Sequence, residues 1–244
     1  MSSQSWLISG ANRGIGFEIL KIIAARPNTI VFAGARTPSK ATDLQNLAAS
    51  SPNVHVIQLE SNSVSDAAAA AKTIQKIAGG LDVVIANAGM GTNWQPATEV
   101  DLESMNQHFQ VNAVGPLILF QAMYPLLMKR KTRKFITVSS TVGSLATNYP
   151  GVPDTAYGAS KAALNFVTKS IAKEHAAKDG IIAIPLHPGA VDTDLGKTVA
   201  TIFGREKMPV TVEQSAQGVM NVVDSATIEQ SGHFLSFDGS EVPW

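Results

Sequence analysis

The sequence contains no cysteine, so it can form no disulfide framework and no thiolate zinc site, and it offers no cysteine nucleophile. Charged residues are also few, at 16%, and their charges balance to zero without any basic block. A neutral chain of this kind argues against nucleic acid as the main partner.

Long apolar runs are missing as well. No run reaches the roughly 18 consecutive apolar residues that a membrane-spanning helix needs. The polar N-terminus, residues 1–5, lacks the basic start and apolar stretch of a signal peptide. We therefore expect a cytoplasmic protein with no membrane partner. Hydrophobic residues make up 45% of the 244 positions, which is enough for the core of one large α/β domain, 1–244.

Seven short runs are rich in strand-forming residues. Several, such as "TIVFAG", "DVVIA" and "IIAIPL", are continuously apolar, which is typical of parallel strands buried on both faces. The predicted strands are Ser5–Ser9, Thr29–Gly34, Asn53–Leu59, Asp82–Ala86, Arg133–Ser139, Gly180–Leu186 and His233–Phe237.

Segments of helical length separate these strands. We predict helices over Gly14–Ala25, Val64–Ala78, Thr98–Lys129 and Thr155–Lys178, the third of them bent or restarted at Gly115-Pro116. The repeated β-α order implies a doubly wound, Rossmann-type α/β fold, a seven-stranded parallel sheet with helices on both faces. Segment 194–212 is the least regular, and we interpret it as a substrate lid.

A glycine-rich loop, "SGANRGIG", follows the first predicted strand and opens the first predicted helix. Glycines let a backbone turn tightly and approach a pyrophosphate, and a helix N-terminus offers free N–H groups to it. The spacing G-x3-G-x-G is weak evidence by itself, because a plain turn and helix start explain it equally well.

A tyrosine and a lysine lie four residues apart in "TAYGASKAALNF", at the front of a predicted helix. That spacing puts Tyr157 and Lys161 on one helix face. A lysine ammonium beside a phenol lowers the pKa of the phenol, so such a tyrosine can exchange a proton with a carbonyl or alcohol oxygen. Alone this pair is common by chance. However, the buried strand "FITVSS" just upstream ends in serines, at the sheet edge where α/β proteins bind ligands.

Together these motifs resemble the short-chain dehydrogenases/reductases, over nearly the whole chain. "SGANRGIG" resembles the family's coenzyme loop T-G-x-x-x-G-x-G, with Ser9 in place of threonine. Further matching segments follow in the family's order: "NAG" (87–89), "VNAVGP" with Asn112, Ser140-Thr141-Val142-Gly143, Tyr157 with Lys161, and "HPGAVDTDL". The style of the sequence also resembles a branch with NADP-dependent polyketide ketoreductases and C-factor-like proteins.

The resemblance implies catalytic roles for four residues. Tyr157 would be the general acid in reduction, and Ser140 would hold and polarise the substrate carbonyl. Lys161 would lower the pKa of Tyr157 and bind the nicotinamide ribose. Asn112 would hold a water that links Lys161 to solvent, although a residue that satisfies backbone at a helix kink explains Asn112 as well.

The sequence departs from the family pattern in two places. The gap between Ser140 and Tyr157 is a few residues longer than usual, through "TNYPGVPD", beside the expected substrate pocket. Glu60-Ser61 stands where the family usually has aspartate before a small residue. The adenine contact is therefore expected to differ in detail.

The second predicted strand favours NADP(H) over NAD(H). An NAD enzyme usually ends this strand with an acid that binds the ribose hydroxyls. Here Ala35 is followed by Arg36, which can grip a 2′-phosphate, and Arg13 is a second candidate. Both arginines could also be ordinary surface charges. The expected coenzyme contacts are Gly10, Asn12, Arg13, Gly14, Ile15, Gly16, Arg36, Glu60, Ser61, Asn87, Ala88, Gly89, Tyr157, Lys161, Pro188, Gly189, Val191 and Thr193.

These features predict an NADPH-dependent reductase that turns an apolar ketone into a secondary alcohol. The expected pocket residues are Met90, Trp94, Tyr149, Val152, Leu195, Ile202 and Phe203. The resemblance also implies a homodimer or homotetramer built through the long helices 98–129 and 155–178.

Two rival functions fit the sequence less well. A non-catalytic regulator that senses NADP(H) would have no need for all four catalytic residues. A metal-dependent hydrolase lacks ligands, because the five histidines are scattered without metal-binding spacing, so no metal site is expected.

Overall fold

The computed structural model describes residues 3–147, 149–202 and 204–244. Its centre is a parallel seven-stranded sheet in the order β3-β2-β1-β4-β5-β6-β7, which confirms the predicted fold class. The strands are β1 (Gln4–Ser9), β2 (Thr29–Ala35), β3 (Val54–Gln58), β4 (Val83–Ala86), β5 (Lys134–Val138), β6 (Ile182–His187) and β7 (Leu235–Ser236). All seven predicted strands are present, and β7 is shorter than predicted.

Alternation along the strands divides the core into two layers. Leu7 lies beside Phe32 and Val84 in the sheet, and all three belong to one buried cluster. The next residue, Ile8, lies beside Ala33 and Ile85, and these belong to the cluster on the opposite face. Because successive side chains point to opposite faces, continuously apolar strands require a helical layer on each side.

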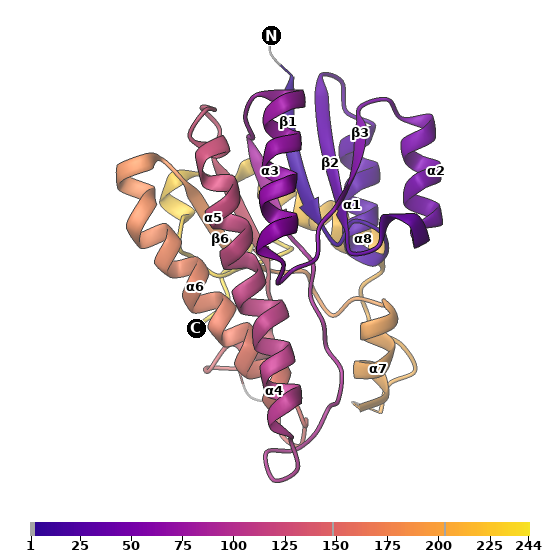
Figure 1. Cartoon of the computed structure of the whole chain (residues 1–244). Helices are drawn as coiled ribbons and strands as arrows, with labels where there is room; N and C mark the ends of the chain where they lie inside the picture. The colour runs from indigo at the N-terminus through magenta and orange to yellow at the C-terminus, as the bar shows by residue number, and fades with distance from the viewer. Residues whose placement is uncertain (1–2, 148, 203) are drawn as a thin grey trace.

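The helices supply these layers (Figure 1). Residues of α3, α5 and α6 pack into one cluster, and residues of α1, α2 and α8 pack into the other. The helices are α1 (Gly14–Ala24), α2 (Thr42–Ser50), α3 (Val64–Ala78), α4 (Leu102–Phe109), α5 (Gly115–Leu127), α6 (Thr155–Asp179), α7 (Asp194–Ile202) and α8 (Val212–Ser225). The sequence prediction included neither α2 nor α8.

The predicted long helix, 98–129, is a helix in three parts. Asp101 caps the start of α4 by accepting a hydrogen bond from the Ser104 N–H, so the helix begins later than predicted. A π-helical segment, η2 (Gln110–Val114), joins α4 to α5. Of the two predicted alternatives at Gly115-Pro116, a bend or a new start, the structure shows the second, since α5 begins at Gly115 with Pro116 in its first turn.

Segment 194–212 is more regular than predicted, because α7 occupies its first nine residues. Glycine is required at position 196, because a Cβ there would collide with the Val191 carbonyl. Figure 1 shows α4 and α7 extending past the sheet at the same end, where the strands finish. This end of the sheet carries the predicted site residues.

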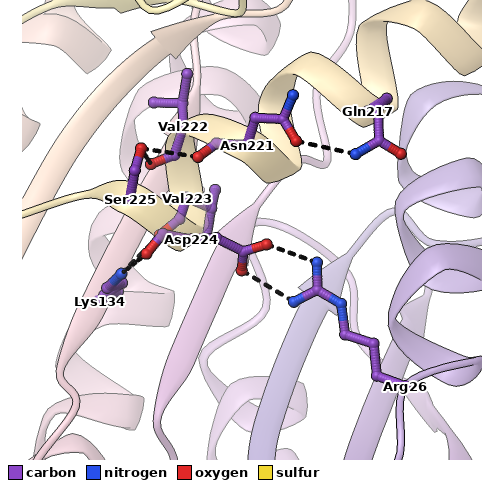
Figure 2. A network of polar contacts seen from close by, with 8 residues as sticks. All are labelled: Arg26, Lys134, Gln217, Asn221, Val222, Val223, Asp224 and Ser225. Carbon is purple, nitrogen blue, oxygen red and sulfur yellow. Dashed lines mark hydrogen bonds and ion pairs between the residues drawn. The ribbon is translucent and has the colours of Figure 1, made fainter.

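The opposite end of the sheet is tied together by charged side chains (Figure 2). Arg26, just after α1, donates to both carboxylate oxygens of Asp224, at 2.9 and 2.7 Å. The Lys134 Nζ donates to the carbonyls of Val223 and Asp224 at 2.7 and 3.0 Å. A cation on the last carbonyls of a helix stabilises its C-terminus, so α8 is fixed to β5 and α1 there.

Of the helices in the described ranges, none combines the length and the apolar character that crossing a membrane requires.

Candidate active site

The glycine-rich loop lies between β1 and α1, against the end of β4. Gly10 and Gly14 have φ of 65° and 55°, in the left-handed region that favours glycine. A Cβ on Gly10 would lie 2.9 Å from the Cα of Ala88, so the loop also needs glycine for its close approach to the segment after β4. Asn12 lies in the turn itself, and Ile15 is the second residue of α1.

The start of α1 is suited to an anion. Arg13 is the N-cap residue, and in the described structure its side chain makes no capping hydrogen bond. Within the described residues, the first turn of α1 contains no acidic residue. The free N–H groups and the positive end of the helix dipole therefore face the loop, as a phosphate site requires.

The segment 87–89 closes this loop from the other side. The Asn87 Nδ2 donates to the carbonyls of Ser9 and Gly10 at 3.0 and 3.1 Å. The Ala88 N–H donates to the Ser9 Oγ at 3.0 Å. Gly16 packs so tightly on the Gly10 carbonyl and the Asn87 amide that no Cβ would fit. Serine therefore supplies here the hydroxyl that the family's threonine would supply.

The residues predicted for the adenosine end lie at the ends of β2 and β3. Arg36 directly follows β2 and is exposed. Glu60 is also exposed, whereas Ser61 is partly buried and lines a small cavity together with Ser9 and Ala88. Ser61 and Ala88 thus face the same space.

Arg13 contacts α7 in this structure. Its guanidinium forms an ion pair with Asp194 of α7 at 3.2 Å, and both side chains are about three-quarters exposed. This pair links the glycine-rich loop to α7. The role of Arg13 as a phosphate ligand stays a prediction.

Tyr157, Lys161 and Ser140 meet at the carboxyl end of β5. Lys161 is buried, and its Nζ donates to the carbonyl of Val138, the last residue of β5, at 2.8 Å. That nitrogen lies 5.7 Å from the centre of the Tyr157 ring. Burial lowers the pKa of Lys161 to about 8, because a charged ammonium loses its hydration there.

The predicted direction of the Tyr157 pKa is wrong in this structure. Burial raises the pKa of Tyr157 to about 12, and a hydrogen bond with Ser140 partly offsets the rise. The Lys161 ammonium donates to the Val138 carbonyl, and the loss of hydration on burial decides the direction of the Tyr157 pKa shift.

The two serines after β5 have separate surroundings. The Ser139 side chain is buried and donates to the Asn165 Oδ1 at 2.5 Å. Ser140 caps the short 3-10 helix η3 (Thr141–Gly143) and is the serine that contacts Tyr157. A Cβ on Gly143 would lie 2.6 Å from the Lys161 backbone, so glycine lets η3 rest directly on α6.

Asn112 lies in the π-helical segment, fully buried. Its amide accepts from the Met90 N–H and donates to the Met90 carbonyl, both at 2.8 Å. It also donates to the Ser160 Oγ at 2.9 Å. Asn112 therefore joins the loop after β4 to the helix that carries Tyr157 and Lys161, and its part in a proton relay stays a prediction.

The segment after β6 reaches back toward the glycine-rich loop. Gly189 has a φ of 90°, and the Ser215 hydroxyl of α8 donates to the Pro188 carbonyl at 2.6 Å. Val191 pairs with Val210, which fixes the chain on both sides of α7. The Thr193 Oγ1 accepts from the Gly196 N–H at 3.1 Å, so its own hydrogen remains available to a ligand.

Predicted substrate residues converge on Gly91. A Cβ there would lie within 3.3 Å of Leu195, Tyr157 and Trp94. Met90 directly precedes this glycine, and the Tyr149 hydroxyl lies 2.9 Å from the Thr141 Oγ1, next to Ser140.

Two of the remaining three predicted pocket residues lie near Tyr149 and at the end of α7. The Val152 N–H donates to the Tyr149 carbonyl at 3.2 Å, and Ile202 is the last residue of α7. Phe203 lies outside the described residues.

Three positioning residues have no motif of their own. The Ser160 Oγ donates to the Tyr157 carbonyl at 2.7 Å, and the buried His108 accepts from the Thr92 N–H at 3.1 Å. His187, whose pKa burial lowers to about 4, accepts from the Thr141 N–H at 3.3 Å. Ser160 directly precedes Lys161 and His187 opens the segment "HPGAVDTDL", whereas His108 gave no signal in the sequence.

Comparison with known proteins agrees with this geometry. Residues 4–201 match the family model described as short chain dehydrogenase. The chain is 41% identical to a short-chain dehydrogenase of Neurospora crassa, covering 97% of this chain and 96% of that protein. It is 37% identical to norsolorinic acid ketoreductase of Aspergillus parasiticus, covering 98% and 90%. A solved structure of NADPH-bound carbonyl reductase from chicken fatty liver matches with a TM-score of 0.90, at 32% identity over the full length of both chains. The chain therefore belongs to the short-chain dehydrogenases, a family of oxidoreductases.

Proposed function

We propose that this protein is an NADPH-dependent carbonyl reductase that converts an apolar ketone into a secondary alcohol. The observation that carries the proposal is the meeting of Ser140, Tyr157 and Lys161 at the carboxyl end of β5, beside the open N-terminus of α1. Relatives named as ketoreductase and carbonyl reductase support the direction of the reaction.

Tyr157 gives the proton in this mechanism. Bound NADPH would supply a hydride to the carbonyl carbon. With a pKa of about 12, the Tyr157 phenol keeps its proton throughout the neutral range, as a general acid must. Its proton passes to the carbonyl oxygen, which the Ser140 hydroxyl polarises, and the product is the alcohol.

Lys161 restores that proton. Because burial lowers the pKa of Lys161 to about 8, its ammonium can release a proton near neutral pH. Asn112, joined to α6 through Ser160, would lead the replacement proton in from solvent. The same ammonium favours the phenolate that exists before Tyr157 is protonated again.

The residues at the adenosine end fit NADP(H). β2 ends in Ala35 without a carboxylate, so nothing at that position repels a 2′-phosphate, and the exposed Arg36 can bind it by charge-assisted hydrogen bonds. The matching chicken carbonyl reductase is named as NADPH-bound. This reaction suits the cytoplasmic location predicted from the sequence.

The substrate side is apolar. Trp94, Leu195 and the Tyr157 ring converge there, and Leu195 comes from α7. We infer that α7 acts as the substrate lid, held over the site by the Arg13–Asp194 ion pair and the Val191–Val210 bridge.

We also propose a homodimer or homotetramer built through α4, α5 and α6. Phe109 and Phe166, on α4 and α6, are 48% and 73% exposed, although aromatic side chains usually find cover. Equilibrium sedimentation is expected to show an oligomer that Phe166→Asp weakens. A wild-type monomer at micromolar concentration would contradict this.

The reductase activity is tested by following NADPH consumption with a panel of apolar ketones. We expect consumption that requires both protein and ketone, and slower consumption with NADH. Tight NADPH binding without turnover of any ketone would instead favour the non-catalytic regulator.

A further inference from the structure

The indole of Trp94 is an unused hydrogen-bond donor beside the acid. Its ring packs against the Tyr157 ring with centroids 5.1 Å apart. The Nε1 atom is buried and has no hydrogen-bond partner in the described part of the chain. A buried N–H without a partner costs about 1–3 kcal/mol, so such groups in proteins are usually paired.

The loop that carries Trp94 is held in place, so this position is not accidental. Met90 is clamped by Asn112, and the Thr92 N–H donates to the ring of the buried His108 at 3.1 Å. Asn93 then adopts a left-handed φ of 50°, which asparagine tolerates better than most residues. Two anchors and a turn thus direct the Trp94 ring onto Tyr157.

The edge of the indole that carries the nitrogen lies close to Gly91. The Cζ2 atom, two bonds from Nε1, lies 3.3 Å from the position of a Cβ on Gly91. Tyr157 and Leu195 approach the same point to 3.2 and 2.6 Å. The nitrogen-bearing edge of the indole therefore lies close to both Tyr157, the proposed acid, and Leu195 of α7, the proposed lid.

An unpaired tryptophan N–H is not a ligand site by itself, as Trp6 shows. The Trp6 Nε1 is also buried and unpartnered within the described residues, but its side chain is 1% exposed in the core, with the Arg26 guanidinium 5.5 Å from the ring centre. Trp94 differs in its position against Tyr157. Trp6 therefore serves as a matched control.

We propose that the Trp94 Nε1–H donates a hydrogen bond to a second oxygen of the substrate, close to the carbonyl that Tyr157 protonates. This inference rests on the proposed reductase function and narrows it. The preferred ketones carry a neighbouring hydroxyl or carbonyl, as β-hydroxyketones and diketones do, and a plain apolar ketone leaves the indole N–H unpaired.

The kinetic test compares benzylacetone with its benzylic β-hydroxy derivative, which differs by one oxygen. We expect wild type to prefer the hydroxyketone about ten- to hundred-fold in kcat/KM, in line with one buried hydrogen bond. In Trp94→Phe this preference falls to near one, and in Trp6→Phe it is kept. An equal preference in wild type and Trp94→Phe would overturn the proposal.

A binding measurement keeps the proposal testable without turnover. Proton–nitrogen correlation NMR of the NADP⁺-loaded wild type resolves indole signals, and Trp6→Phe and Trp244→Phe assign that of Trp94 by elimination. The Trp94 proton is expected to shift downfield with the hydroxyketone and to stay in place with benzylacetone. A signal that responds alike to both, or to neither, overturns the inference. Failure to reduce either ketone, with the shift present, would instead count against the reductase function.

Discussion

Two lysines touch the two ends of β5, and their surroundings differ. Lys134 begins the strand and donates to the Val223 and Asp224 carbonyls, with the Asp224 charge opposing the lowering of its pKa by burial. Lys161 donates to the carbonyl that ends the strand, and burial lowers its pKa to about 8, with desolvation as the cause. The charge of Asp224 partly offsets the cost of burying Lys134, whereas within the described residues no opposite charge offsets that cost for Lys161.

The same contrast extends to the neighbouring groups. At the amino end of the sheet, Arg26 pairs with Asp224, and Asp82 accepts from both the Ser5 N–H and hydroxyl. At the carboxyl end, the Trp94 Nε1 and the Asp192 Oδ1 are buried without partners in the described residues, whereas at the amino end the unpartnered Trp6 Nε1 belongs to a ring that contacts the Arg26 guanidinium. Buried groups that lack partners reduce stability, and they are typical of sites kept for a ligand.

The largest expected effect comes from removing the uncompensated lysine. Lys161→Met should lower ketone turnover by ~10²–10⁴-fold, because Tyr157 loses the cation that stabilises its phenolate and renews its proton. Steady-state NADPH oxidation measures this. Lys134→Met, the matched change at the other end, is expected to leave turnover within about two-fold of wild type. Equal losses of turnover in both variants would contradict the distinction between the two lysines.

The second-largest effect is expected on the choice between NADPH and NADH when Arg36 is replaced. Arg36→Asp replaces the proposed phosphate ligand with a carboxylate that repels the 2′-phosphate. NADPH binding should weaken by ~10–100-fold, while NADH binding changes little or improves. Fluorescence titration with each coenzyme measures this, and Lys40→Asp is a nearby charge control. A wild-type preference for NADH would show that Arg36 is only a surface charge.

Replacing Lys161 by methionine should raise the stability of the protein while it lowers the activity. The folded pKa, about 8, lies below the ordinary value of 10.5, so the unfolded chain binds this proton more tightly. The resulting cost is fully present below pH 8 and fades as the pH rises toward 10.5. Lys161→Met should therefore raise the free energy of unfolding by about 1 kcal/mol at neutral pH, after the loss of the hydrogen bond to Val138.

Urea unfolding at two pH values tests that sign. The difference in free energy of unfolding between Lys161→Met and wild type should shrink when the pH is raised from neutral to near the ordinary lysine pKa of 10.5. A variant that is less stable than wild type at neutral pH would show that the bond to Val138 outweighs desolvation.

The smallest effect is expected at the compensated end. Lys134→Met removes two hydrogen bonds and a favourable charge from the last turn of α8, which should lower the free energy of unfolding by about 1 kcal/mol. Thermal unfolding measures this. A stabilised variant would mean that Lys134 is as poorly compensated as Lys161.

The sequence predicts the sheet well because each strand has a clear local signal. Continuous apolar runs require burial on both faces, so β1 to β6 were found within about two residues. The motifs also predicted that Ser140, Tyr157 and Lys161 belong to one site, since each lies just after β5 or on α6.

The missed helices gave weaker local signals. In α2 only Leu44 is buried, so the apolar stripe is too short to recognise. In α7, Gly196 argued against a helix, although the packing on Val191 requires it. For α8 a signal existed: Thr211 and Gln214 form a capping box, whose three-residue spacing is visible in the sequence.

The site's electrostatics could not be predicted, because they depend on contacts between distant segments. The spacing of Tyr157 and Lys161 suggested a lowered tyrosine pKa. Burial of the Tyr157 ring decided the direction of its pKa shift, and the Lys161 ammonium is directed to the Val138 carbonyl, 23 positions away in sequence. The orientation of Trp94 likewise depends on His108 and Asn112, which reach its loop only in the folded chain.

The most direct test of the account is Tyr157→Phe, measured for NADPH affinity and ketone turnover in the same preparation. We predict that NADPH binding weakens only a few-fold, because Tyr157 is one of many expected coenzyme contacts, and that turnover falls by ~10³-fold or more, because the proton donor is gone. Turnover that survives in Tyr157→Phe would contradict the assignment of this residue as the acid, and the proposed chemistry at the carboxyl end of β5 with it.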